Sequence, residues 1–349
     1  MIDIGERKPS ALPPAATALI ISAAAWYLLR ELTPLLRPLL LAIFLCYVIL
    51  PGYHGLRKKF PGHLAVMMLA GGTMLVLYLI VLVLQDNVLA LREDLPRLTN
   101  RAKAIIVSGR EFVNETFPWM APSAEEMTRA DEMRVATLRD SLTPWLNFGA
   151  NLLVEAGLVA VYVLFLLLDA SRWPNRLRTA FHRDQGENVM GVVSKINDSI
   201  VSYFRVQVIA SLGLGVGVTL IMWGTGTSFP VLWGLLNFFG NFVPYLGSIV
   251  GYTVPVVFCF LDHELGWPPV IAAILMMILH LVLAYFVVPT MTGKAVGLSP
   301  LVVLISLSFW GLCWGVPGMV LAVPLTVIVK IILFNIPFTQ PLAVMLADE

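Results

Sequence analysis

A few polar and ionisable residues stand in or beside long apolar runs of the sequence, and they are the first candidates for chemistry. Glu155, Arg205 and His280 are such residues, and Gln207 follows Arg205 by two positions. A charge at bilayer depth costs a few kcal/mol, so it usually faces a partner or a water-filled cavity. We expect either ion or proton coupling at these four positions, or plainer roles: a hydrogen-bonded packing histidine and charges that reach the membrane surface.

The stretch Asn241–Gly251 reads N-F-V-P-Y-L-G-S-I-V-G inside one of these apolar runs. Proline removes a backbone donor, and glycine lets the chain turn. In hydrocarbon, the freed backbone groups must be satisfied by protein or by water in a cavity. We therefore expect a broken helix whose tip lines a translocation site, formed by Asn241, Pro244, Tyr245, Gly247 and Ser248. The alternative is that these residues only kink packed helices.

The sequence motifs of enzymes and metal sites that we considered are incomplete in this chain. The His-Glu pair at His263 lacks the second histidine of H-E-x-x-H, and the Gly-Lys pair at Gly293 lacks the rest of a phosphate-binding loop. The three cysteines, Cys46, Cys259 and Cys313, form no C-x-x-C pair and indicate small buried side chains. We expect no catalytic residue, no metal and no cofactor.

Composition indicates a polytopic integral membrane protein. Hydrophobic residues make up 58% of the chain and charged residues 13%, whereas about 25% is typical of soluble domains. Several apolar runs reach the ~18 residues that suggest a transmembrane helix. The net charge of +1 argues against a nucleic-acid partner.

The first half predicts four membrane segments: Ala15–Leu29, Leu35–Leu50, His63–Leu84 and Leu152–Leu168. The first resembles a signal peptide, but a second apolar stretch follows at once. We expect the first two to form a hairpin joined by Arg30–Pro34, with the first helix retained.

A charged segment, Gln85–Trp145, separates the third and fourth spans. It carries an apolar stripe at helical spacing, formed by Leu91, Leu95, Leu98, Ala102, Ile105 and Phe112. We expect an amphipathic helical insert outside the bilayer, either a packing or oligomerisation element or a lid over a pore. Basic residues after the second and fourth spans, Arg57–Lys59 and Arg172–Arg183, put the chain termini in the cytoplasm and the insert outside.

The second half carries an approximate internal repeat, 206–261 and 269–332. Each unit is one full span followed by an apolar segment with a break near its middle, at Pro244–Gly247 and at Gly315–Gly318. Loop charges give the two units opposite topology, so we expect two re-entrant hairpins, Pro230–Leu261 and Pro300–Ile332, whose halves are each too short to cross. Opposed broken helices form substrate sites in many inverted-repeat transporters, which adds Gly315, Pro317 and Gly318 to the candidate site. The expected domains are 1–84, 85–148, 149–205 and 206–349.

At these residues the chain resembles the AI-2E family of membrane transporters. The resemblance is carried by Tyr203-x-Arg205-x-Gln207, Asn241-Phe-Val-Pro244-Tyr-x-Gly247, Pro289-x-Met291-x-Gly293-Lys294-x-Val296-Gly297-Leu298-x-Pro300, and Gly315-x-x-Gly318 with Leu321-Ala-Val-Pro324. It implies an all-α protein of about eight membrane segments, a transporter or exporter, and a homo-oligomer in the bacterial inner membrane. It also adds Pro289 and Gly293 to the candidate translocation residues.

The chain departs from the family at Leu283 and Tyr285, where many relatives carry Glu and Asn. This departure weighs against cation antiport. We expect a secondary transporter of small polar solutes, such as an autoinducer-2-like molecule or another metabolite. The alternatives are a cation/proton antiporter of the same family and a membrane scaffold that transports nothing. The expected partners are the cargo, the lipid bilayer and further copies of the chain.

Overall fold

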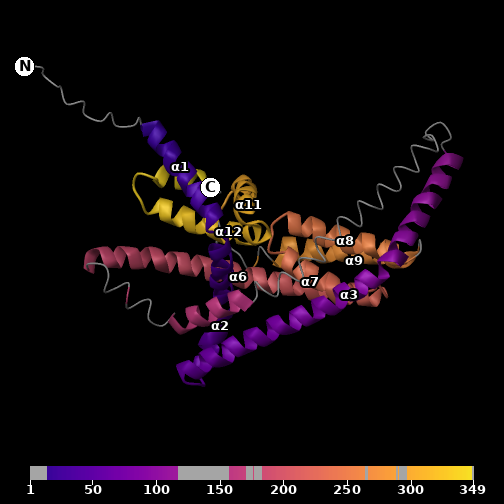
Figure 1. Ribbon diagram of the computed structural model, residues 1–349, viewed down its shortest axis with the longest axis horizontal. Helices are drawn as coiled ribbons and strands as arrows, with labels where there is room; N and C mark the ends of the chain where they lie inside the picture. The colour runs from indigo at the N-terminus through magenta and orange to yellow at the C-terminus, as the bar shows by residue number, and fades with distance from the viewer. Residues whose placement is uncertain are drawn as a thin grey trace, which may run out of the picture.

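The computed structural model describes residues 14–116, 157–169, 176, 183–263, 266–287, 290 and 297–347. Its regular elements are helices (Figure 1), apart from one isolated bridge between Leu298 and Ala347. They are α1 Pro14–Glu31, α2 Thr33–Arg57, α3 Gly62–Thr116, a helix at Gly157–Asp169, α6 Arg183–Gly224, α7 Pro230–Gly240, α8 Leu246–Asp262, α9 Trp267–Val282, a π-helical turn at Leu283–Val287, α11 Pro300–Trp314, α12 Val316–Phe334 and α13 Gln340–Met345.

Several helices of the described chain are long and apolar enough to cross a membrane. They are Leu64–Ile105, Val189–Gly224, Trp267–Phe286 and Val316–Phe334. Between 11% and 39% of the most apolar window of each is buried inside the protein. The remaining apolar surface must face lipid or other chains, because large exposed apolar patches are rare on soluble monomers. The protein is therefore a polytopic membrane protein.

The junction of α1 and α2 differs from the expected hairpin. The two helices meet at a bend of 75°, and together they are long and apolar enough for one broken span or a re-entrant loop. Leu32 keeps near-helical dihedrals, and its carbonyl oxygen accepts the N–H of Leu36 at 2.8 Å. Pro34 lacks the donor that would continue the ladder. A missing bond of this kind bends a helix without reversing it, so the structure shows a bend of 75° here and does not confirm the expected hairpin.

Helix α3 runs without interruption from the third apolar run into the charged segment. It has 55 residues, or about 83 Å at 1.5 Å per residue, so no break in the helix marks residue 85. We call residues 85–116 the arm. Leu91, Leu98 and Ala102 of the expected stripe are buried, and the first two pack against α6–α9. The rest of the insert, from residue 117, lies outside the described residues.

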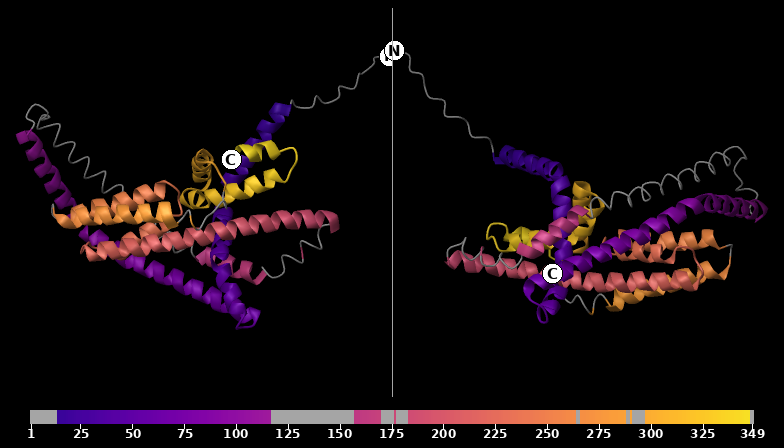
Figure 2. Two further views of the ribbon diagram at one scale, coloured as in Figure 1. Left: turned by 180° about the vertical axis from the view of Figure 1, so that it is seen from behind. Right: turned by 60° about the horizontal axis from the view of Figure 1, so that its bottom comes forward.

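The second half is organised around α6. Helices α7 and α8 form one helical hairpin and α11 and α12 form another, and both contact α6 (Figures 1 and 2). Glycine contacts fix the first: a Cβ at Gly215 of α6 would lie 3.0 Å from the carbonyl oxygen of Gly234 in α7. The second packs nearer the start of α6, where Tyr203 contacts Val323 and Val327. The two hairpins therefore contact neighbouring stretches of α6, the first near Gly215 and the second near Tyr203.

The lengths of the hairpin helices agree only in part with expectation. Helix α7 has 11 residues and α8 has 17, and neither reaches the length of a candidate span. Helix α12 has 19 residues and is long enough by itself to cross. The expectation that all four halves are too short therefore does not hold for α12.

Candidate functional site

The first helical break is a tight turn at residues 241–245. The N–H of Val243 donates to the carbonyl oxygen of Gly240, and the N–H of Gly247 donates to that of Val243, each at 2.9 Å. Tyr245 has a φ of 61°, which is uncommon for a residue with a side chain. A Cβ at Gly247 would overlap the carbonyl oxygen of Gly240. The turn therefore requires glycine at position 247.

Two polar side chains of α6 hold this turn. Gln207 Nε2 donates to the carbonyl oxygen of Asn241 at 2.5 Å, and Asn241 Nδ2 donates to Ser211 Oγ at 3.0 Å. Gln207 and Ser211 are four residues apart, so they share one face of α6. Ser211 is fully buried. We call Gln207, Ser211 and Asn241 the polar knot. Sequence analysis predicted Gln207 and Asn241 and missed Ser211, because a lone serine in an apolar run carries little signal.

Asn237 is a second polar residue that sequence analysis missed. Its side chain is 1% exposed, and its Nδ2 donates to the carbonyl oxygens of Trp233 at 3.0 Å and Gly251 at 2.8 Å. It therefore links α7 to α8. Its Oδ1 has no hydrogen-bond partner in the described structure. A Cβ at Gly251 would lie 2.6 Å from that oxygen, so a larger residue here would force the Asn237 side chain to move. The signal was the spacing of Asn237 and Asn241, one helical turn apart.

The second break lies at Gly315, between α11 and α12. Its φ is 67° and its ψ is −144°, a backbone conformation that suits glycine. A Cβ at Gly318 would overlap the carbonyl oxygen of Trp310. Pro317 lies at the start of α12, where its missing N–H is tolerated. The predicted break is therefore present between α11 and α12, and the role of its three residues in translocation stays a prediction.

A group of hydroxyls joins the two helices of this hairpin. Thr326 Oγ1 lies 2.9 Å from Ser306 Oγ and accepts a hydrogen bond from Trp310 Nε1 at 3.4 Å. Ser306 and Thr326 are both buried. They place polar groups inside an apolar hairpin, and sequence analysis missed them.

The turn of the first hairpin packs on the second. Val243 is 8% exposed and belongs to one buried cluster with Leu307 of α11 and Ala322 of α12. Met319, the residue after Gly318, packs against the same cluster. The turn of the first hairpin thus packs through Val243 on α11 and α12, and Met319 is the residue of this contact nearest the second break. The meeting of the two breaks at a translocation site stays a prediction.

Other predicted site residues lie at the margin or elsewhere. Tyr245, Ser248 and Arg205 are exposed. His280 lies on α9, where its Nδ1 is 3.1 Å from the carbonyl oxygen of Met276 and its buried Nε2 has no hydrogen-bond partner in the described structure. Three predicted residues lie outside the described part of the chain: Glu155, Pro289 and Gly293.

The two positions that depart from the family pattern lie in the π-helical turn Leu283–Val287. Such turns are rare and often occur at functional sites. A Cβ at Gly213 of α6 would lie 3.6 Å from Leu283 Cδ2, whereas Tyr285 is 72% exposed. Leu283 is therefore a packing residue here, and Tyr285 faces outward.

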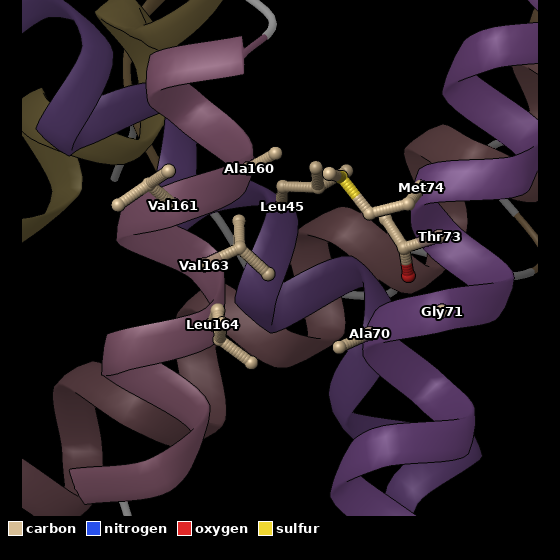
Figure 3. A pocket seen from close by; sticks show the side chains of 9 residues that line it. All are labelled: Leu45, Ala70, Gly71, Thr73, Met74, Ala160, Val161, Val163 and Leu164. Carbon is tan, nitrogen blue, oxygen red and sulfur yellow. The ribbon is translucent and has the colours of Figure 1, made fainter.

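A cavity of about 150 Å³ lies away from both breaks, between α2, α3 and the helix Gly157–Asp169 (Figure 3). Every residue that lines it is apolar or small except Thr73, whose hydroxyl donates to the carbonyl oxygen of Leu69 at 2.8 Å. Because the Thr73 hydroxyl already donates its hydrogen bond within α3, the cavity wall has few groups that could bind a polar solute. The polar groups at the two breaks are the better candidate site.

Comparison with known proteins shows which family the sequence matches. Residues 16–337 match the family described as AI-2E family transporter. The AI-2 transport protein TqsA of Escherichia coli strain K12 is 27% identical over 92% of this chain and 91% of its own. Two others bear the name "Putative transport protein". The one from Borreliella burgdorferi is 28% identical over 59% of this chain and 58% of its own, and YrrI of Bacillus subtilis is 22% identical over 85% of each.

Proposed function

Because the chain belongs to the AI-2E family of transporters, we propose that it is a secondary transporter that moves a small polar solute across the inner membrane. The cargo would be a molecule like autoinducer-2 or another small metabolite. The similar TqsA is named for AI-2 transport. We place the translocation site at the junction of the two helical hairpins.

This proposal rests on the polar knot, because the length of the first hairpin indicates that the knot lies within the membrane. Charged residues Arg97, Arg101 and Asp262 gather at the base of the first hairpin, which suits a membrane surface. From there α7 is about 17 Å long and α8 about 26 Å long, and both are shorter than a ~30 Å hydrocarbon core. The turn between them would then lie within the membrane. Broken backbone at that depth is tolerated where it is buried in protein or lines a cavity.

The side chains that join the two hairpins, Val243, Leu307 and Ala322, are apolar, and the polar groups that favour transport over a scaffold lie beside this contact. A scaffold would pack the meeting point of the hairpins with apolar side chains alone. Val243, which packs against Leu307, is apolar. Two polar residues are close to this pair in the sequence: Asn241 is two residues before Val243, and Ser306 directly precedes Leu307. A solute that displaced Val243 would meet these amide and hydroxyl groups.

Cation/proton antiport remains the second candidate, and His280 is the residue that favours it. Its Nε2 is buried without a partner in the described structure, so it could exchange a proton. Its position on α9, however, is set by the bond to Met276 and an edge-on contact with Tyr252. We expect sodium-driven proton flux in liposomes to be weak or absent; strong flux that is lost in His280→Ala would favour the antiporter.

The proposal is tested with Gly247→Leu in purified protein reconstituted into liposomes. A side chain at 247 would overlap the Gly240 carbonyl, so we expect solute flux to fall about tenfold or more while membrane insertion is kept. Gly72→Leu on α3 is the matched control, since a Cβ there meets nothing within 4 Å. Flux is measured across candidate polar solutes, with and without a pH gradient. Normal folding with wild-type flux in Gly247→Leu would move the site elsewhere.

A further inference from the structure

Asp262, the last residue of α8, joins three parts of the molecule. Its side chain is 5% exposed and pairs with Arg97 of the arm. Its Oδ2 accepts the backbone N–H of Ser228 at 2.6 Å, just before α7 begins. One carboxylate therefore ties both ends of the first hairpin to each other and to α3.

Arg101 strengthens the same junction. Its Nη1 donates to the backbone carbonyl oxygen of Asp262 and lies 3.4 Å from that of Leu261. These carbonyls end α8 and have no partner within the helix, so a guanidinium there satisfies them. Arg101 Nη1 is also 3.9 Å from Asp262 Oδ1. We call Arg97, Arg101 and Asp262 the clasp.

Apolar packing continues from the clasp along the arm. Leu91 and Leu98 are buried in one cluster with Trp233 of α7 and with Phe258 and Cys259 of α8. The arm thus contacts both helices of the hairpin. A buried carboxylate that loses its partners is left as an uncompensated charge, which is strongly unfavourable. Separation of the arm from the hairpin would break the ion pairs of Asp262 and expose the apolar cluster around Leu91 and Leu98.

We propose that Asp262 is a positioning residue that makes the arm and the first hairpin one rigid unit. The arm then fixes the orientation of the hairpin that ends in the polar knot, and it does not lift away as a separate lid. The effect on flux rests on the proposed transport function. The rigid unit itself does not, and it is measured without any cargo.

The cargo-independent test is a distance measurement between spin labels. Labels are placed at Val107→Cys on α3 and Val257→Cys on α8, which are 44% and 48% exposed, in a chain with the three native cysteines replaced. We expect one narrow distance distribution in the parent and a broad one in Asp262→Asn. Asp169→Asn removes a partly exposed carboxylate paired with Arg176 and should stay narrow. A broad parent, or an equally narrow Asp262→Asn, would overturn the proposal.

The functional test joins the arm to the hairpin covalently. In the same background, Arg101→Cys and Leu261→Cys are bridged by a short bifunctional thiol reagent, which leaves Arg97 and Asp262 in place. Because Arg101→Cys itself removes part of the clasp, flux is compared in this double variant before and after bridging. A unit that moves as one body should show the same flux within about twofold, and Asp262→Asn should lose about tenfold. Bridging that abolishes flux would show that arm and hairpin must separate. Absence of flux in the parent would instead count against the transport function, and the label distances would still decide on the rigid unit.

Discussion

At the scale of single residues, the polar knot separates side-chain from backbone roles. The carbonyl oxygen of Asn241 accepts from Gln207, whereas its side chain donates to Ser211. A substitution at Asn241 therefore keeps the first bond and breaks the second. This explains why we expect Asn241→Leu to reduce transport less than Gly247→Leu, which disturbs the turn itself.

The pairing of Asn241 with Ser211 is testable by a double-mutant cycle. Each of Asn241→Leu and Ser211→Ala should lower the free energy of unfolding by about 1–3 kcal/mol, since each leaves a buried partner without its bond. The double variant should lose clearly less than the sum, because the second change removes a group already unpaired. The measurement is denaturant unfolding in detergent micelles. Additive losses would mean that the two side chains do not stabilise each other.

At the scale of helices, the breaks could be predicted from the sequence and the joints between helices could not. The breaks are recognisable in the sequence because glycine interrupts an apolar run at Gly247, Gly315 and Gly318. The bend at Pro34 and the unbroken course of α3 depend on which backbone hydrogen bonds form in the folded helix. Residue types alone do not determine this. Asn237, Ser211 and Thr326 were missed for a related reason, since their partners lie on other turns or other helices.

Val243 gives a prediction about the two hairpins. It lies in one buried cluster with Ala322, so the first turn is seated on the second hairpin. Bridging Val243→Cys to Ala322→Cys with a short cleavable thiol reagent should hold the two breaks together and stop flux, and cleavage of the bridge should restore it. Each single cysteine variant, treated alike, is the control. Full flux in the bridged protein would mean that this contact does not open during transport.

At the scale of the whole molecule, many large apolar side chains of the described chain are exposed. Trp223 and Trp267 are 72% and 79% exposed, and aromatic residues of this kind are enriched at membrane interfaces. The family and the class of polytopic helical membrane protein could be predicted from the sequence, whereas the lengths of the helices and the apolar faces that meet lipid could not. Assembly of several copies stays a prediction, and these faces are where it would occur.

The sidedness of the membrane is the prediction that joins all three scales. The arm ends at one extreme of the molecule, and α6 begins at the other (Figures 1 and 2). Ser108 on the arm and Ser194 near the start of α6 are both exposed, so either position can carry a reactive cysteine. The loop charges predict that the arm lies outside and Arg172–Arg183 in the cytoplasm. An impermeant thiol reagent added to intact cells should therefore label Ser108→Cys, and Ser194→Cys should react only after the membrane is opened. Labelling of both from one side would reverse the topology and, with it, the side from which the clasped hairpin enters.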